Sequence, residues 1–402
     1  MADSTLRSGQ TLLPSTASAA HSPAARRMTD LVKLLSELIA LPSVNPAFVE
    51  PGSRVAGERL VAEFLVRTAA NAGLDVQMSR VLPDRDNVII RLTPRGRIRR
   101  RIVLAPHMDT VGASGPQLKP VLKGGRIHGR GACDTKGSVA AMLGALLDVA
   151  AGKNRPTQTE IIFTGLIDEE NNQSGSRALA KAKFKADLAI VGEPTLCEVV
   201  SAHKGDLWLK LTTKGVAAHG ATPSLGRNAI LEMARVVQLL ETDYAASLKT
   251  RTHSLLGSPT INVGSIKGGR QPNIVPDLCE ISADRRTLPG ETEATVRREL
   301  AALFKKHGLA VTVADTKGAP CLPMETDGKL PLVQLFLKAA QRKRSLGVHY
   351  FCDASILSNA GTPSIVFGPG DIAQAHTADE WVAVSELERA RAVLVKFLRS
   401  LP

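Results

Sequence analysis

The sequence predicts an α/β protein whose sheet is covered by helices on both faces, interrupted by an inserted α+β unit. Two observations support this prediction. Short, continuous apolar runs alternate with helical patterns up to residue 202, and from about residue 203 the runs alternate with a period of two. Apolar residues make up 44% of the 402 residues and charged residues 22%, which is typical of a globular protein with a sizeable core.

The first pattern predicts the elements of the larger sheet. Buried strands are expected at 87–92, 101–106, 160–166 and 188–193, and helices at 30–40, 55–70, 136–151 and 175–182. Strands that are apolar throughout and are joined by crossover helices belong to sheets covered on both faces. Residues 319–402 return to this pattern, with a helix at 329–341, a strand at 363–368 and a final helix at about 385–399. We expect them to complete the sheet.

The inserted unit shows one apolar face along each element. The strand at 206–212 places Leu207, Leu209 and Leu211 on one side. Asn228 is expected to cap a helix whose apolar stripe is Ile230, Met233, Ala234 and Val237. Two strands follow, at 260–266 and 278–286. After them come a helix that carries Val296, Leu300, Leu303 and Phe304 and a strand at 309–313. This β-α-β-β-α-β order predicts a ferredoxin-like domain at 203–318, inserted between 29–202 and 319–402.

The chain is basic, since Lys and Arg outnumber Asp and Glu by 13. The densest cluster is Arg95, Arg97, Arg99, Arg100 and Arg101, in a stretch predicted to be a solvated hairpin between two strands. Two Trp and two Tyr are too few for base-stacking platforms. Nucleic-acid binding is therefore a weak alternative, and a basic enzyme acting on anionic metabolites explains the charge equally well.

Cysteine usage and the N-terminus bear on location. The five cysteines are scattered and form no CxxC pair, which argues against disulfides or a thiolate zinc site and favours a reducing, cytoplasmic location. No apolar run is long enough to cross a membrane. Residues 1–28 are rich in Ser, Thr and Ala without the apolar core of a secretory signal, so we predict a disordered tail, with a transit peptide as the alternative.

Potential metal ligands follow the predicted buried strands. They are His107 and Asp109 after 101–106, Glu169 and Glu170 after 160–166, Glu193 at the end of 188–193, and His376 after 363–368. Because strand ends meet at one rim of an open α/β sheet, these side chains are expected to converge. Asp134 precedes the helix at 136–151, where it could also be only an N-cap. Imidazoles and carboxylates suit Zn²⁺, and five ligands favour two metals sharing one carboxylate.

From about residue 30 onwards the chain resembles the two-zinc hydrolases that include acetylornithine deacetylase, succinyl-diaminopimelate desuccinylase, aminoacylase-1 and bacterial carboxypeptidase G. The matching segments are "APHMDTV", "GRGACDTKG", "DEE", "VGEPT", "GVAAHGATPSLGRNAI", "GGRQPNIVPD", "ADRRTLPGET" and "GPGDIAQAHTADEWV". The resemblance implies a zinc-exopeptidase-like catalytic domain with a mixed sheet, and an inserted domain that serves as dimerisation and lid domain.

The resemblance also implies roles for the candidate ligands. Asp134 would bridge two metal ions, with His107 and Glu193 on one and His376 and Glu170 on the other. Asp109 would orient His107. Zinc is the expected metal, with cobalt as the alternative, and the peptide bond between Asp134 and Thr135 is expected to be cis. Glu169 would be the general base that takes a proton from the metal-bridging water and passes it to the leaving amine.

Three further residues match positions that bind the substrate in this family. His219 corresponds to a histidine that reaches the partner's active site and stabilises the oxyanion, which implies a homodimer. Asn273 and Arg286 correspond to residues that hold the substrate's backbone and carboxylate. The alternation of 278–286 supports Arg286 independently, since it shares the polar face with Glu280, Ser282 and Asp284, whereas Arg285 lies on the other face.

The expected activity is hydrolysis of the amide bond of a small N-acyl amino acid with a free carboxylate, as in the deacetylases and desuccinylases. An exopeptidase or dipeptidase with the same machinery is the close alternative. A non-catalytic binding protein of the same fold is a remote one, because every expected ligand position holds a competent residue.

Overall fold

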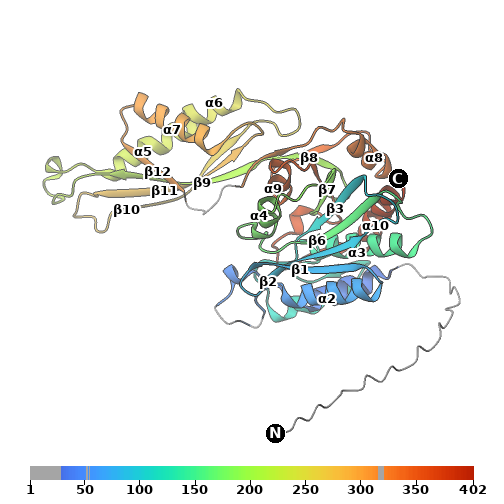
Figure 1. Ribbon diagram of the computed structural model, residues 1–402. Helices are drawn as coiled ribbons and strands as arrows, with labels where there is room; N and C mark the ends of the chain where they lie inside the picture. The colour runs from blue at the N-terminus through green and yellow to red at the C-terminus, as the bar shows by residue number, and fades with distance from the viewer. Residues whose placement is uncertain (1–28, 51–52, 54, 316–320) are drawn as a thin grey trace, which may run out of the picture.

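A computed structural model describes residues 29–50, 53, 55–315 and 321–402 (Figure 1). The predicted tail, residues 1–28, lies outside the described residues. Within the described part of the chain, no helix combines the length and apolar character needed to cross a membrane. Two sheets with separate hydrophobic cores dominate the molecule, and a third, three-stranded sheet lies beside the first.

Nine described strands form the large sheet. Its order is β1 (Asp75–Leu82), β2 (Arg85–Leu92), β6 (Thr159–Gly165), β3 (Arg100–Pro106), β7 (Leu188–Gly192), β15 (Ser364–Val366), β8 (Val200–His203) and β13 (Met324–Glu325), with β14 (Leu346–Val348) also paired to β8. The central neighbours β6, β3, β7 and β15 are parallel, whereas the pairs β1–β2, β2–β6, β15–β8 and β8–β13 are antiparallel and β14 runs parallel to β8. The sheet is therefore mixed, as expected.

Helices cover both faces of the large sheet, which confirms the prediction from its apolar strands. In β3, Ile102 and Leu104 face the core shared with α1 (Leu31–Ala40), α2 (Arg59–Asn71), α3 (Lys136–Ala151), α8 (Pro331–Ala339) and α10 (Val384–Arg399). Val103 and Ala105 face the opposite core, under α4 (Ser174–Lys181) and α9 (Ala354–Asn359). Because both sides of the strand are buried, the sequence of β3 is apolar without alternation.

The sequence prediction omitted one strand of this sheet and was wrong about one connection. Strand β1 was not predicted, because it is a half-exposed edge strand in which apolar residues are interrupted by Gln77, Ser79 and Arg80. The arginine-rich stretch with Arg95, Arg97, Arg99, Arg100 and Arg101 is not a hairpin, because β6 lies between β2 and β3. That stretch connects non-adjacent strands, and its arginines are exposed except for the half-buried Arg100.

The small unit, residues 205–315, has the predicted β-α-β-β-α-β order. Its antiparallel sheet runs β10 (Thr260–Gly268), β11 (Leu278–Thr287), β9 (Gly205–Lys214), β12 (Val311–Asp315). The helices α5 (Ala229–Leu239), α6 (Ala245–Lys249) and α7 (Glu293–Lys306) lie along one face of this sheet (Figure 1). Leu207, Leu209 and Leu211 pack against that layer, as predicted.

Helix α5 is capped by Asn228 as predicted, and of the predicted stripe Met233 is buried and Val237 is partly buried. The buried residues are Ala229, Met233, Val236 and Leu239, whereas Ile230 and Ala234 are exposed. Two overlapping apolar stripes exist in "AILEMARVVQL", and periodicity alone does not say which one faces the sheet. In α7 the predicted Val296, Leu300 and Phe304 are buried.

The three-stranded sheet joins distant segments next to the rim of the large sheet. It is made of β16 (Trp381–Ala383), β5 (Arg126–His128) and β4 (Val121–Lys123). The pairing of β16 with β5 brings the segment after His376 beside the loop that leads to Asp134. Both predicted ligands are thus held at the same edge of the molecule.

Candidate metal centre and adjoining pocket

Strand ends deliver the candidate ligands to one place, as the sequence predicted. His107 directly follows β3, Glu193 directly follows β7, and Glu169 and Glu170 follow β6 after a short turn. His376 comes from the loop after β15. Asp134 lies one residue before Thr135, the N-cap of α3, so it is not itself the cap.

Asp134 stands between the two histidines. Its Oδ1 lies 3.1 Å from His107 Nε2, and its Oδ2 lies 3.3 Å from His376 Nε2. A carboxylate that directs one oxygen toward each imidazole has the arrangement expected of a ligand shared by two cations. The peptide bond between Asp134 and Thr135 is cis, as expected.

Asp109 organises both sides of the site. Its backbone oxygen lies 3.0 Å from His107 Nδ1 and its Oδ1 3.4 Å, so the Nε2 of that imidazole is left to face the centre. The two carboxylate oxygens of Asp109 also accept hydrogen bonds from the backbone N–H groups of Glu169 and Glu170, each at 3.1 Å. One buried carboxylate therefore fixes the histidine and the turn that carries the glutamate pair.

The potential ligand atoms form two groups. His107, Glu169 and Glu193 make one, Asp134, Glu170 and His376 the other, and within each group the ligand atoms lie within 4.8 Å of one another. Glu193 Oε1 is buried, accepts no hydrogen bond from the described residues, and lies 3.9 Å from His107 Nε2. An unsatisfied buried carboxylate oxygen beside an imidazole is chemically suited to a divalent cation.

The site brings four carboxylates close to two imidazoles in a buried place, and this shifts the pKa values of its members. Burial, reinforced by neighbouring carboxylates, raises the pKa of Glu169 and Glu193 well above the usual range and that of Glu170 to about 7. Hydrogen bonds that the His376 imidazole donates to the Asp134 and Glu170 carboxylates raise its pKa to about 10. Without a cation the cluster thus retains protons, and bound cations would replace them as the compensating charge.

Asn45, Asp168 and Glu380 hold the ligand-bearing segments in place by hydrogen bonds, although none of them was predicted as a site residue. Asn45 donates to Asp109 at 2.8 Å and to Asp168 at 2.9 Å, and Asp168 precedes the glutamate pair in a left-handed conformation with φ of 64°. The buried Glu380 accepts hydrogen bonds from the backbone N–H groups of Gly131, Cys133 and Asp134. These partners are far away in the chain and follow no recognisable spacing, so no local pattern reveals them.

A cavity of about 550 Å³ opens beside the ligands. Its twelve lining residues are Asp134, Glu169, Glu170, Asn171, Glu193, Trp208, Arg286, Tyr350, Phe351, Ile372, Ala375 and His376. Arg286, from β11 of the small unit, therefore faces the same space as the candidate metal ligands. Arg285 is fully buried against Tyr244 and Glu291, in agreement with the prediction that it points to the other side of the sheet.

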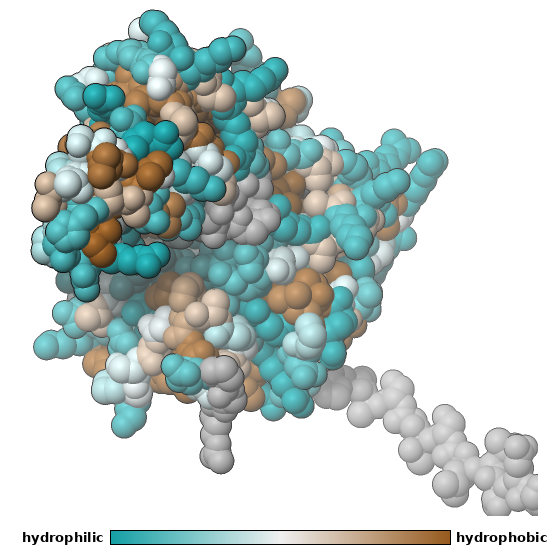
Figure 2. Space-filling view, turned by 90° about the vertical axis from the view of Figure 1, so that its left-hand side faces the viewer, coloured by the Kyte–Doolittle hydropathy of each residue, from teal (hydrophilic) through white to brown (hydrophobic). Residues whose placement is uncertain are grey.

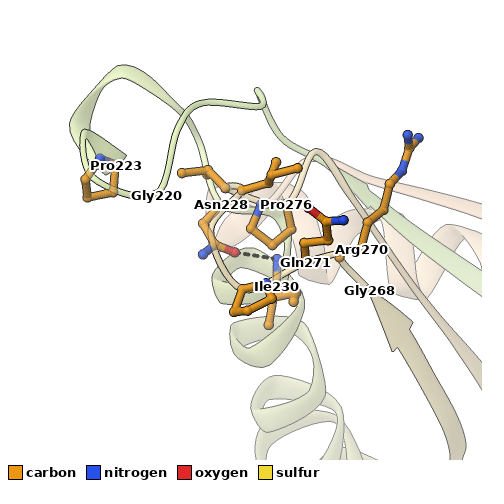
Figure 3. Close-up of a pocket in the computed structure, with 12 residues that line it drawn as sticks. Gly220, Pro223, Asn228, Ile230, Gly268, Arg270, Gln271 and Pro276 are labelled. Atoms are coloured by element: carbon orange, nitrogen blue, oxygen red, sulfur yellow. Dashed lines mark hydrogen bonds between the residues drawn. The ribbon is translucent and has the colours of Figure 1, made fainter.

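His219 and Asn273 do not line this cavity. They lie next to each other at the end of the small unit that is remote from the large sheet. There the Gly220 N–H donates to the Asn273 carbonyl, and His219 forms an isolated antiparallel β-bridge with Ile274. A separate hollow of about 510 Å³ lies in the same region, lined by Gly220, Asn228, Arg270 and Ile274 among others (Figure 3). Within one chain these two predicted residues are thus separated from the metal ligands.

Comparison with known proteins identifies the family of the chain. The model of "Peptidase family M20/M25/M40" matches residues 103–400. The chain belongs to this peptidase family. It is 31% identical to an acetylornithine deacetylase of Myxococcus xanthus over 81% of this chain and 87% of that protein. It is also 32% identical to a peptidase M20 domain-containing protein of Schizosaccharomyces pombe, over 89% and 85%.

Solved structures support the M20 fold. The aminopeptidase PepT of Bacillus cereus superposes with a TM-score of 0.74 at 23% identity, covering 92% of this chain and 97% of that one. The Bacillus subtilis YXEP protein, described as a dinuclear metal-binding peptidase of the M20 family, superposes with a TM-score of 0.67 at 12% identity over 92% and 97%. The resemblance found in the sequence is therefore confirmed at the level of the M20 metallohydrolases.

Proposed function

We propose that this M20 protein hydrolyses the amide bond of a small N-acyl amino acid with a free carboxylate, in the manner of the deacetylases and desuccinylases. The observation that carries the proposal is the cavity in which Arg286, four acidic residues of the cluster and His376 face the same space. A guanidinium can bind the substrate carboxylate in a bidentate manner while the amide lies over the ligands. Relatives named acetylornithine deacetylase support this assignment.

Five residues would hold two divalent cations, which we propose to be zinc, with cobalt as the alternative. Asp134 would be shared, with His107 and Glu193 on one side and Glu170 and His376 on the other. The donor set fits, because Glu193 Oε1 is buried without a described partner and Asp134 divides its oxygens between two imidazoles. When bound, such a pair lowers the pKa of a water molecule and polarises the scissile carbonyl.

The side chains of the protein would perform the remaining steps. Glu169 would accept a proton from the attacking water and return it to the leaving amine, a role that suits a carboxylate whose pKa burial has raised. Asp109 would keep His107 oriented throughout. Arg286 would fix the carboxylate, so that only the correctly placed amide reaches Glu169.

We further propose that the chain acts as a cytoplasmic homodimer through a ferredoxin-like domain at 203–318, which also serves as a lid over the catalytic domain. His219 and Asn273 are remote from the cavity in their own chain, so the partner subunit's His219 and the partner subunit's Asn273 would complete the site, with His219 stabilising the oxyanion. Exposed apolar residues lie on the small unit, including Leu225 (75%) and Leu231 (62%). Figure 2 shows hydrophobic side chains on this end of the molecule.

An exopeptidase or dipeptidase is the second candidate. Arg286 would bind the C-terminal carboxylate of a short peptide equally well, and the structural neighbours include proteins described as an aminopeptidase and a tripeptidase. A metal-loaded preparation assayed with acetyl-amino acids, succinyl-amino acids and dipeptides separates the two. Preferred turnover of acyl-amino acids supports the proposal, and preferred turnover of dipeptides favours the alternative. Turnover of none, with two metal ions bound, would point to the remote possibility of a binding protein.

A further inference from the structure

The cavity is lined partly by apolar and aromatic side chains, here called the apolar wall, although amide cleavage does not require them. Five of its twelve lining residues are apolar or aromatic: Trp208, Tyr350, Phe351, Ile372 and Ala375. The chain contains only two Trp and two Tyr, and one of each is in this cavity. A substrate bound in the cavity would therefore contact aromatic side chains, which are scarce elsewhere in the chain.

Trp208 belongs to the same surface as the carboxylate-binding arginine. In the register of β9 and β11, Trp208 pairs with Asp284, and Arg286 is two residues further along the same face. Diagonal neighbours of this kind are close enough for long side chains to reach each other. Trp208 is 45% exposed and Ile372 is 39% exposed, so both present apolar surface to the open cavity.

Tyr350 and Phe351 link this surface to the metal ligands. The Arg286 guanidinium carbon lies 5.9 Å from the centre of the Phe351 ring. The Tyr350 hydroxyl donates a hydrogen bond of 3.1 Å to the carbonyl of Pro194, the residue after Glu193. With its hydroxyl committed to the backbone, Tyr350 is anchored beside the metal ligands, while Phe351 lies beside Arg286.

We propose that this wall selects substrates whose amino acid carries an aromatic or large branched apolar side chain. The inference rests on the proposed function, because the α-carboxylate must occupy Arg286. The carboxylate and the side chain leave the same α-carbon, so a carboxylate on Arg286 brings the side chain within reach of Trp208 and Phe351, the aromatic neighbours of Arg286. Burial of an aromatic side chain in such a pocket contributes binding that glycine does not gain.

A cationic side chain fits this wall less well. The carboxylates close to Arg286 are Asp284, whose Oδ2 lies 2.9 Å from Nη2, and Asp206, whose Oδ1 lies 3.9 Å from Nε. Both face the guanidinium, so an ammonium group beside them would also meet its positive charge. The other carboxylates of the cavity are the candidate metal ligands and Glu169, so next to Arg286 an ammonium group meets only carboxylates that already face a guanidinium.

The test compares kcat/KM for N-acetyl-L-phenylalanine, N-acetyl-L-leucine, N-acetyl-L-ornithine and N-acetylglycine on the full-length, metal-loaded protein. We expect phenylalanine and leucine to exceed glycine and ornithine by at least about tenfold. Trp208→Ala and Phe351→Ala should reduce the phenylalanine-to-glycine ratio toward one. Leu122→Ala, at an exposed position outside the cavity, is the matched control and should keep the parental ratio.

Equal kcat/KM values for the four substrates, or a ratio that both variants leave unchanged, would overturn the inference while the proposed function stands. Should no substrate turn over, fluorescence of the metal-free protein decides separately. In a Trp381→Phe background Trp208 is the remaining tryptophan, and N-acetyl-L-phenylalanine should change its emission saturably at concentrations at least about tenfold lower than N-acetylglycine. Equal affinities for the two ligands would again contradict the inference.

Discussion

Glu169 and Glu170 are neighbours in the chain, yet the structure assigns them to different groups of ligand atoms. We expect Glu169→Gln to lower kcat by about 10²–10⁴-fold, since the amide cannot accept a proton, while two metal ions per chain remain bound. Metal analysis and kinetics of the same preparation provide the measurement. Glu193→Gln is the comparison and should lose metal. Loss of one metal ion in Glu169→Gln would instead make Glu169 a ligand.

His203 predicts how stability depends on pH. It is fully buried at the end of β8, and burial lowers its pKa to about 4. The unfolded chain takes up a proton near pH 6.5 and the folded chain only near pH 4, so stability is complete above pH 6.5 and falls as pH drops toward 4. The loss amounts to about 3 kcal/mol.

Denaturant unfolding of the parent and of His203→Gln between pH 7.5 and 4.5 measures this loss. Glutamine keeps a hydrogen-bond donor for the Lys204 carbonyl but does not titrate, so the variant should show a smaller decrease in the free energy of unfolding. Substitution of the exposed His307 by Gln should leave the dependence of the free energy of unfolding on pH as it is in the parent. If the free energy of unfolding depended on pH identically in the parent and in His203→Gln, His203 would not be the group responsible for the loss.

The predicted ligand set came from simple local evidence, because each member except Asp134 follows an apolar run. Asn45, Glu380 and Trp208 have no such local signal in the sequence. Asn45 and Glu380 act through hydrogen bonds to segments more than 60 residues away. Trp208 lines the cavity only because β9 of the small unit borders the ligand site, and the alternation of β9 indicates no more than the face on which it lies.

The N-terminus of α5 offers a test of a single element. The Asn228 side chain accepts hydrogen bonds from the backbone N–H groups of Ile230 at 2.9 Å, drawn in Figure 3, and of Leu231 at 3.2 Å. Asn228→Ala should lower the free energy of unfolding by about 1 kcal/mol, measured by denaturant titration. Asn228→Asp retains the acceptor and should cost less than Ala. Gln238→Ala, on the exposed side of the same helix, should stay within about 0.5 kcal/mol of the parent.

Elements were predicted best where burial is complete on both sides or strictly alternates. The central strands and α3 follow the apolar pattern of the sequence closely. Two of the four residues predicted to be buried in α5, Ile230 and Ala234, are exposed, because the sequence contains two apolar stripes and tertiary packing selects between them. Strand β1 was not predicted, because this edge strand is largely exposed and its sequence lacks the continuous apolar run of a buried strand.

The assembly of two chains can be tested with inactive variants. If the partner's His219 completes each site, co-expressed His219→Ala and Glu169→Gln chains should recover about a quarter of the parental activity. Half of the dimers would then be mixed, and one of their two sites would be intact. Each variant expressed alone should remain inactive and is the control. Failure to recover activity in purified mixed dimers would contradict the shared site.

The connection between the two sheets has a practical consequence. Met324 of β13 is paired directly with His203 of β8 in an antiparallel ladder, so the two ends of the small unit emerge side by side. A two-residue Asn-Gly turn would span that gap and join β8 and β13 as a β-hairpin at the edge of the large sheet. The resulting truncated protein would retain all five candidate ligands while losing Arg286 and Trp208, which makes it a minimal scaffold for studying cation affinity apart from substrate recognition.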